Sequence, residues 1–262
     1  MTTPPPTVAP AVPPPLEGRR ALVTGGAQGL GRAIVDRLTA AGAALAVLDR
    51  DTAGLEAVRA DHPAVVTVPV DLTDADAADA AVGTAFDALD GLDILVNNAG
   101  LIRNAPLVDL LRRTTRAERL ALWDTVIATN LTAVHAVTMS VAERMARRRL
   151  KGVIVSIGSI CARGNPGQSA YAAAKAGIEA LTATWARELG PLGIRAVCVA
   201  PGFADTPSTH AALTGARVAE VAGEVPLRRL GTADEVALAV QQAIENGYIN
   251  GTVLRVDGGL VM

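Results

Sequence analysis

The sequence contains very few aromatic residues, with two Phe, two Tyr and two Trp among 262 residues. Proteins that bind single-stranded nucleic acids usually stack the bases on aromatic side chains, so this scarcity argues against such a function. The 24 basic residues are balanced by 26 acidic ones, which gives a net charge of −2. A chain with this balance has no general attraction for polyanions. We therefore expect no nucleic-acid partner.

Cysteine and histidine are also scarce, with two Cys and three His. His62, His135 and His210 are far apart in the sequence, and no two of them have the spacing of a metal-binding pair. We therefore expect no metal site. Cys161 and Cys198 are expected at a pocket wall and in a buried strand, and two cysteines in an α/β chain of this size are more often free thiols than a disulfide.

No run of residues is long and apolar enough to suggest a membrane-spanning helix, although half of the residues are hydrophobic. The segment Met1–Pro15 is rich in proline and uncharged. It lacks the basic region and the apolar core of a signal peptide, so we expect a disordered tail, followed by one domain over residues 16–262. We expect no membrane partner and a cytoplasmic location.

The sequence does contain a glycine-rich turn. A short apolar run at Ala21–Val23 predicts a buried strand, and Arg32–Ala41 has the pattern of a helix. Between them lie Gly25, Gly29 and Gly31. Glycines let the backbone approach a pyrophosphate, and the N-terminus of the helix offers free N–H groups to the phosphates. This arrangement predicts a dinucleotide-binding turn.

A second predicted strand, Ala44–Leu48, ends at Asp49, about 18 residues after Gly31. A carboxylate at this place can accept hydrogen bonds from both ribose hydroxyls of an adenosine, and it would repel a 2′-phosphate. We therefore expect NAD rather than NADP as the cofactor. Arg50 is an argument for NADP, because it could pair with a 2′-phosphate. A solvated arginine at the start of a loop is the simpler interpretation of this residue.

Two further predicted strands end in polar or small residues. The strand Val65–Val70 is followed by Asp71 and Leu72, and the strand Leu92–Val96 by the sequence Asn-Asn-Ala-Gly at 97–100. Ligands of open α/β sheets bind at the carboxyl ends of the strands. These residues are therefore expected at the same edge as the glycine-rich turn.

Tyr171 and Lys175 lie four residues apart in a predicted helix, which puts both side chains on one face. An isolated phenol titrates near pH ~10, and a neighbouring positive charge lowers that value. The pair is thus a candidate acid/base. By itself the spacing is common, and a half-buried aromatic beside a solvated lysine is the ordinary interpretation; the accompanying motifs favour the catalytic one.

These motifs together resemble those of the short-chain dehydrogenases/reductases, over approximately residues 18–262. The motifs are Thr24-Gly-x-x-x-Gly-x-Gly, Asn97-Asn-Ala-Gly, Asn130, Ser159, Tyr171-x-x-x-Lys175 and Pro201-Gly202. The resemblance implies an α/β fold of the Rossmann type, doubly wound, with a mainly parallel sheet of about seven strands and helices on both faces. It also implies a homotetramer and an NAD(P)-dependent reaction between a secondary alcohol and a ketone.

The resemblance further implies a role for each catalytic residue. Tyr171 would be the acid/base, and Lys175 would lower its pKa and hold the nicotinamide ribose. Ser159 would hydrogen-bond the reacting oxygen, and Asn130 would support a relay water on Lys175. Ser156 is the alternative serine, but the family spacing of twelve residues before Tyr171 selects Ser159, and Ser156 lies inside a predicted strand.

Thr206 is expected to hold the nicotinamide carboxamide. The full set of residues expected to bind the cofactor is Gly25, Gln28, Gly29, Leu30, Gly31, Asp49, Asp71, Leu72, Asn98, Ala99, Gly100, Tyr171, Lys175, Pro201, Gly202, Phe203 and Thr206.

Two regions are expected to decide the substrate, because the fold itself does not. The first is the stretch of about thirty residues between Gly100 and Asn130, which contains Leu110-Leu-Arg-Arg-Thr-Thr-Arg. The second is Phe203–Val225, expected to be a mobile lid. We expect the two to frame a channel, with Arg112, Arg113 or Arg116 near its mouth to meet phosphates; a solvated surface insertion is the simpler interpretation of the first stretch.

Within the family, the chain is most similar to type II 3-hydroxyacyl-CoA dehydrogenases, which are also described as 17β-hydroxysteroid dehydrogenases. The likeness rests on the long first region, the acidic end of the second strand, the motif Pro201-Gly-x-x-x-Thr-Pro and the sequence near the C-terminus. It implies interconversion of 3-hydroxyacyl-CoA and 3-oxoacyl-CoA, with reduction favoured near neutral pH. The run Gly258–Met262 is a candidate interface segment.

Three alternatives stay open. A 3-oxoacyl-carrier-protein reductase is suggested by Gly164-Asn-Pro-Gly-Gln-Ser-Ala-Tyr, and the arginine run Arg147–Arg149 could meet a phosphorylated carrier or simply complement a helix dipole. A dehydrogenase of another secondary alcohol, such as a sugar, a polyol or a steroid, is the second alternative. A non-catalytic dinucleotide sensor is the third, and the presence of all four catalytic residues argues against it.

Overall fold

The computed structural model describes residues 14–111, 113–206, 209–210 and 215–260. Most of the predicted tail Met1–Pro15 therefore lies outside the described residues, as do Arg112, part of the predicted lid Phe203–Val225 and the last two residues of Gly258–Met262.

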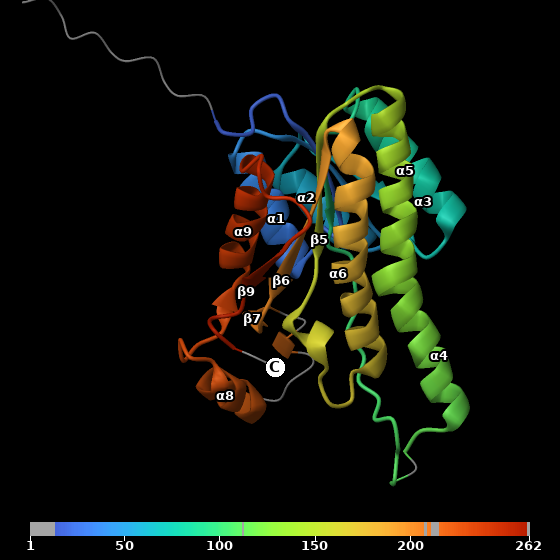
Figure 1. Cartoon of the computed structure of the whole chain (residues 1–262), viewed down its shortest axis with the longest axis vertical. Helices are drawn as coiled ribbons and strands as arrows, with labels where there is room; N and C mark the ends of the chain where they lie inside the picture. The colour runs from blue at the N-terminus through green and yellow to red at the C-terminus, as the bar shows by residue number, and fades with distance from the viewer. Residues whose placement is uncertain (1–13, 112, 207–208, 211–214, 261–262) are drawn as a thin grey trace, which may run out of the picture.

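Seven parallel strands form one sheet, in the order β3-β2-β1-β4-β5-β6-β9 (Figure 1). The chain starts in the middle of the sheet, runs outward to β3 and returns to continue from β4, so the strand order reverses between β1 and β4. The predicted doubly wound, mainly parallel seven-stranded sheet is thus confirmed. The strands are β1 (Arg20–Thr24), β2 (Ala44–Asp49), β3 (Val66–Pro69), β4 (Ile94–Asn97), β5 (Gly152–Ile157), β6 (Ile194–Pro201) and β9 (Val253–Val256).

Helices cover both faces of this sheet (Figure 1). Alternate residues of β1 serve the two faces: Ala21 and Val23 pack into one hydrophobic cluster and Leu22 into the other. Burial on both faces explains why the strands are continuous apolar runs in the sequence. The helices are α1 (Gly29–Ala40), α2 (Thr52–Asp61), α3 (Ala75–Ala88), α4 (Arg116–Ile127), α5 (Ala133–Arg147), α6 (Ser169–Leu189), α8 (Gly215–Glu224) and α9 (Ala233–Glu245), with short helices η1 (Ala128–Thr132), η2 (Ile160–Arg163) and η3 (Gly190–Leu192) and a small sheet of β7 (Ala204–Asp205) with β8 (Gly231–Thr232).

The helices α4 and α5 are joined through η1 into one helix of 32 residues, Arg116–Arg147. By length and composition alone this helix could cross a membrane, whereas the sequence analysis predicted no membrane-spanning helix. Half of its most apolar window is buried inside the fold, where α5 contributes Val137, Val141 and Met145 to the hydrophobic cluster on one face of the sheet. We therefore interpret it as a core helix of the layer beside the sheet.

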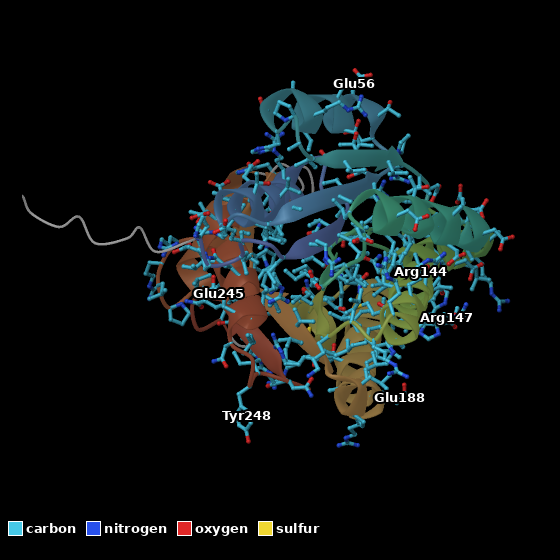
Figure 2. The ribbon with its side chains drawn as sticks, turned by 90° about the horizontal axis from the view of Figure 1, so that it is seen from above. Glu56, Arg144, Arg147, Glu188, Glu245 and Tyr248 are labelled. Carbon is cyan, nitrogen blue, oxygen red and sulfur yellow. The ribbon has the colours of Figure 1, made fainter. Side chains whose placement is uncertain are left out.

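The arginine run at the end of α5 is largely neutralised by carboxylates. Arg147 pairs with Glu143 at 3.4 Å, and Arg148 pairs with Asp90 at 2.9 Å. Figure 2 shows Arg147 at the outer surface of the molecule. These pairs support the interpretation of the run as a solvated helix end rather than a patch for a phosphorylated partner.

Candidate active site

The glycine-rich turn follows β1 and leads into α1, as predicted. Gly25 has a φ of +65° and Gly29 a φ of +56°, values that strongly favour glycine. Gly31 is required for a different reason. A Cβ on Gly31 would lie 1.9 Å from the carbonyl oxygen of Gly25 and 2.4 Å from Nδ2 of Asn98. The turn is therefore packed so closely that larger residues do not fit.

The end of β4 holds this turn in place. Nδ2 of Asn98 donates to the carbonyl oxygens of Thr24 at 3.1 Å and Gly25 at 2.8 Å. The backbone N–H groups of Asn98 and Ala99 both donate to Oγ1 of Thr24 at 3.1 Å. The side chain of Asn98, predicted to bind the cofactor, is thus used to fix the turn, and its neighbours Ala99 and Gly100 continue along the same edge.

The first turn of α1 leaves its backbone N–H groups available. Gln28 is the N-cap residue, and its side chain makes no capping hydrogen bond. The N–H groups of Gly29 and Leu30, in the first turn, can therefore donate to an anion. Together with the closely packed glycines, this forms a cradle that fits a pyrophosphate.

Asp49 stands at the carboxyl end of β2, next to this cradle. Its Oδ2 accepts from the N–H of Ala27 and its Oδ1 from the N–H of Asp51, both at 3.0 Å. These two bonds fix the half-buried carboxylate beside the turn, and each oxygen keeps capacity to accept a ribose hydroxyl. The residues present therefore fit an adenosine diphosphate group; that they bind one stays a prediction.

Asp71 lies on the exposed surface after β3. Its Oδ1 accepts from the N–H and the hydroxyl of Thr73 at 2.9 and 2.7 Å. These hydrogen bonds lower the pKa of Asp71, and the charge of Arg50 lowers it further. Arg50 thus acts on Asp71, and Leu72 packs partly buried against a hydrophobic cluster. The predicted contacts of Asp71 and Leu72 with the cofactor stay predictions.

Tyr171, Lys175 and Ser159 are brought together in a buried site. Tyr171 and Lys175 come from the first two turns of α6, and Ser159 follows β5. Nζ of Lys175 donates to the carbonyl oxygen of Ile157 at 2.7 Å and lies 5.6 Å from the centre of the Tyr171 ring. Oγ of Ser159 accepts from the N–H of Cys161 at 3.1 Å. The exposed fractions of Tyr171, Lys175 and Ser159 are only 8, 4 and 8%.

The protonation of this pair follows from its burial. Removal from water raises the pKa of Tyr171, while a hydrogen bond with Ser159 acts in the opposite direction. Burial also lowers the pKa of Lys175 to about 8. Each group is shifted toward its neutral form, as desolvation requires. The effect of burial on the pKa of Tyr171 thus opposes the effect expected of Lys175, whose predicted role stays a prediction.

Ser156 has a structural position. It lies inside β5, and its Oγ accepts from Nδ2 of Asn97 at 3.3 Å. The same Nδ2 donates to Oγ1 of Thr138 at 2.9 Å. Asn97 therefore links β4, β5 and α5 in the interior, which agrees with the choice of Ser159 as the catalytic serine.

Asn130 is fully buried in the short π-helix η1. Its Oδ1 accepts from the N–H of Leu101 at 3.2 Å, and its Nδ2 donates to the carbonyl oxygens of Leu101 at 2.9 Å and Val126 at 3.0 Å. A Cβ on Gly100 would come within 2.6 Å of Oδ1. Asn130 thus clamps the chain that leaves β4; its support of a relay water stays a prediction. π-turns occur often at functional sites, but no pattern in this sequence signals this one.

Pro201 and Gly202 end β6 at the same edge of the sheet. A Cβ on Gly202 would lie 2.8 Å from Cα of Asp257. Phe203 then packs against the cluster that contains Tyr171, and the buried Oγ1 of Thr206 shares a hydrogen bond of 3.1 Å with Oγ1 of Thr209. The backbone therefore carries these predicted residues toward the catalytic group, although the described part of the lid is limited to β7, α8 and the residues beside them.

Apolar side chains surround Tyr171. Val126, Ile160, Cys161 and Ala170 are buried with it, and Leu101, Phe203, Leu122 and Leu260 are partly buried against them. Burial in this cluster raises the pKa of the Cys161 thiol; its predicted place in a pocket wall stays a prediction. The sequence analysis did not predict Ile160 and Leu260 as neighbours of Tyr171. Ile160 could have been suggested by its position next to Ser159, whereas no pattern in the sequence signals Leu260.

The first predicted substrate region contributes to a cavity of about 280 Å³, which is lined by the 103–107 segment, α4 and the start of α6. Arg116 lines it, whereas Arg113 does not, and no described residue of Phe203–Val225 contributes to its wall. Arg112 and part of the lid lie outside the described residues. The channel that the two regions were expected to frame therefore stays a prediction.

The three histidines remain dispersed. His62 pairs with Asp36 at 2.7 Å, His210 pairs with Asp205 at 2.5 Å, and the ring of His135 stacks on Trp185. Among the residues that the structure describes, no group of three or more His, Cys, Asp or Glu could hold a metal ion.

The arrangement of this site has counterparts in known proteins. A sequence profile of the family described as short chain dehydrogenase matches residues 19–216. Nodulation protein G of Rhizobium sp. (strain N33) is 38% identical over 94% of this chain and 98% of its own length. The 3-oxoacyl-(acyl-carrier-protein) reductase of Thermotoga maritima is 36% identical over 94% and 99%. A solved structure described as a short chain dehydrogenase/reductase family protein has 35% identity and a TM-score of 0.82, over 93% of this chain and 97% of that one.

Proposed function

Because this chain belongs to the short-chain dehydrogenase family, and is therefore an oxidoreductase of alcohol and ketone groups, we propose that it reduces 3-oxoacyl thioesters. The observation that carries the proposal is the buried group of Ser159, Tyr171 and Lys175 beside the pyrophosphate cradle. The relatives at 36–37% identity that are named 3-oxoacyl-(acyl-carrier-protein) reductases support the carrier-protein thioester. The CoA thioester is the second candidate, favoured by the acidic end of β2.

A bound nicotinamide dinucleotide would supply the hydride. The chain itself has to hold the reacting oxygen and deliver one proton. The hydroxyl of Ser159, fixed by the N–H of Cys161, can hydrogen-bond that oxygen. The phenol of Tyr171 then donates its proton to the oxygen as negative charge develops there.

The pair can deliver the proton that reduction consumes. Burial raises the pKa of Tyr171, so the phenol carries its proton at neutral pH. Burial brings the pKa of Lys175 to about 8, close enough to neutral pH for this side chain to take up and release a proton. The role of Lys175 in this proposal is to restore the proton of Tyr171 and to hold the nicotinamide ribose.

We expect NAD to be preferred over NADP. The carboxylate of Asp49 is fixed by the N–H groups of Ala27 and Asp51, and a 2′-phosphate placed there would meet its negative charge. Arg50 is exposed and acts on Asp71. If Arg50 turned toward a 2′-phosphate instead, NADP would be preferred, which makes the cofactor assay decisive.

The function is tested by comparing kcat/KM for reduction of one 3-oxoacyl group carried on an acyl carrier protein, on CoA and on a short synthetic thioester, with steroid, sugar and simple ketones as the other substrates. Each substrate is assayed with NADH and with NADPH, and the Tyr171→Phe variant serves as the blank. We expect the carrier thioester to be best. A non-thioester ketone preferred by tenfold, about 1.4 kcal/mol in transition-state binding, would exclude thioesters. Absence of turnover on every substrate would favour the dinucleotide sensor.

A homotetramer and a cytoplasmic location belong to the same proposal, and both rest on the family resemblance. Of the candidate interface segment Gly258–Met262, the structure describes residues 258–260. Light scattering on the purified full-length chain measures the oligomeric state directly, and a monomer at micromolar concentration would exclude the tetramer.

A further inference from the structure

The cavity of about 280 Å³ beside α4 combines positive charge with an apolar wall. Arg103, Arg116 and Arg119 belong to its lining. Leu107, Leu120 and Trp123 contribute apolar surface, and 84, 54 and 40% of these three side chains is exposed. Large apolar side chains gathered around a hollow, with cations beside them, are typical of a ligand site.

This cavity is separate from the catalytic group. None of Ser159, Tyr171 and Lys175 lines it. The two are nevertheless neighbours, because Ala170 belongs to the wall and precedes Tyr171 in α6. The N–H of Ala105 also donates to the carbonyl oxygen of Gly167 at 2.7 Å. This bond ties the 103–107 segment to the loop that precedes α6.

The three arginines are not neutralised by carboxylates. Within the part of the chain that the structure describes, none of them forms an ion pair. Arg119 donates to the carbonyl oxygen of Thr114 at 2.8 Å, and Arg103 donates to the carbonyl oxygen of Ile102 at 3.2 Å.

Two carboxylates of the same segment have other partners. Asp109 accepts from the N–H and hydroxyl of Thr114, and Glu118 accepts from Thr115 in a capping box. Arg144 and Arg229, by contrast, are paired with Asp79 and Glu235. The positive charge at the cavity is therefore available to an external anion.

We propose that this cavity binds a free aliphatic carboxylate of medium chain length. The chain would cover Leu107, Leu120 and Trp123, and the head group would pair with Arg116 and Arg119. Arginine presents a planar fork of donors that matches a carboxylate. The volume of about 280 Å³ lies just below the ~300–1,000 Å³ of small-molecule pockets, which suits a small anion better than a nucleotide-bearing one such as CoA.

The two tryptophans of the chain allow a direct test. Trp123 lines the cavity, whereas Trp185 is buried and stacked with His135. Decanoate titrated into the full-length protein should change the fluorescence of Trp123. In the Trp123→Phe variant, which keeps Trp185, calorimetry should still detect binding while the fluorescence change disappears.

Charge variants identify the head-group contact. Arg116→Gln and Arg119→Gln should each weaken decanoate binding by about tenfold, equivalent to about 1.4 kcal/mol. Arg113→Gln is the matched control, since Arg113 is an exposed arginine of the same segment that does not line the cavity. It should bind decanoate like the unmodified protein. Decanol, which lacks the charge, should bind at least tenfold more weakly than decanoate.

Three results would overturn the proposal. The first is equal affinity of decanoate for the Arg116→Gln, Arg119→Gln double variant and the unmodified protein. The second is inhibition by decanoate that is competitive with the substrate and persists in that double variant, which would locate the ligand at the catalytic group. The third is absence of binding, including the case in which a second copy of the chain shields Trp123. All binding measurements are independent of turnover, so they hold whichever substrate proves correct.

Discussion

The glycine-rich turn and the 101–115 segment both follow strands at one edge of the sheet, but they are held in very different ways. The turn is fixed by hydrogen bonds from buried strands: the N–H of Gly25 donates to the carbonyl oxygen of Leu48 at 2.7 Å, and Asn98 binds it from β4. In the 101–115 segment, Leu107, Leu110 and Leu111 are 84, 87 and 71% exposed. One region is built into the core, and the other lies on its surface.

This difference separates two properties of the enzyme. The part that binds the cofactor is determined by close packing, so it tolerates little change. The 101–115 segment is determined by surface side chains, which can change without disturbing the sheet; that this segment decides the substrate stays a prediction. The Tyr171 group lies between the two regions, and the following experiments test how far they are independent.

The largest effect is expected for Tyr171→Phe, which keeps the ring and removes the transferable proton. The rate constant of the chemical step should fall by ~10²–10⁴-fold, the range for loss of a general acid. Binding of the cofactor should not change, because the turn and Asp49 are untouched. Steady-state turnover and a fluorescence titration with the dinucleotide measure the two properties. Turnover close to that of the unmodified enzyme would remove Tyr171 from the mechanism.

The next effect concerns Lys175 and pH. Its pKa is about 8 in the folded chain and ~10.4 in an unfolded one. Between these values the unfolded chain binds more protons, so this group makes the free energy of unfolding rise with pH across that window. Below pH 8 the destabilisation caused by burying this lysine is fully present. Replacement by Met should therefore stabilise the chain more at pH 7 than at pH 10, by up to about 3 kcal/mol.

Denaturant unfolding of the unmodified chain and of the Lys175→Met variant, at pH 7 and at pH 10, measures this difference in the free energy of unfolding. Only the difference between the proteins is informative, because burial raises the pKa of Cys198 to about 12 and the thiol contributes a slope of opposite sign. A difference that does not vary with pH would show that Lys175 has an ordinary pKa.

A third experiment tests binding of the cofactor alone. Asp49→Asn removes the charge and keeps one acceptor, so NAD binding should weaken by about 1.5–3 kcal/mol, the range for hydrogen bonds to charged groups. Binding of NADP should improve, because repulsion of the 2′-phosphate is relieved. The ratio of the two dissociation constants is the measurement. Asp36→Asn, on the outer side of α1 where the carboxylate pairs with Arg32, is the control and should leave the ratio unchanged.

The smallest effects compare two glycines directly. Gly31→Ala would place a methyl group 1.9 Å from the oxygen of Gly25, and should lower the free energy of unfolding by about 1–3 kcal/mol, the usual range for overpacking. Gly223 lies in α8, where a Cβ would meet nothing within 4 Å. Gly223→Ala should therefore stabilise the chain by up to about 1 kcal/mol through helix propensity. Equal effects of the two variants would contradict the contrast between a packed and an open region.

Sequence reasoning predicted the strands well, for a physical reason. Strands buried on both faces are continuous apolar runs, so Ala21–Val23 and Ala44–Leu48 differ from β1 and β2 by only one residue at an end. Asp49 at the end of β2 and Asn98 after β4 could be assigned to one edge, because parallel strands end together.

The remaining features depend on tertiary packing. The direction of the pKa shift of Tyr171 is set by burial, which the spacing of Tyr171 and Lys175 does not reveal. The course of the first substrate region depends on α4, whose capping box at Thr115 and Glu118 brings Arg116 to the cavity beside α6. A local pattern shows that a helix begins there, but it does not show which neighbour that helix contacts.

The π-turn at Asn130 has a consequence for large-scale mutagenesis. Nδ2 of Asn130 donates to the carbonyl of Val126, four residues back, where an α-helix would use the backbone N–H. The same amide group clamps Leu101 on the other side. In a mutational scan that scores abundance and activity separately, Tyr171→Phe, which keeps the buried ring, should lower the activity score alone. Substitutions at Asn130 should lower both scores, because one amide group serves the continuity of the helix and the shape of the site.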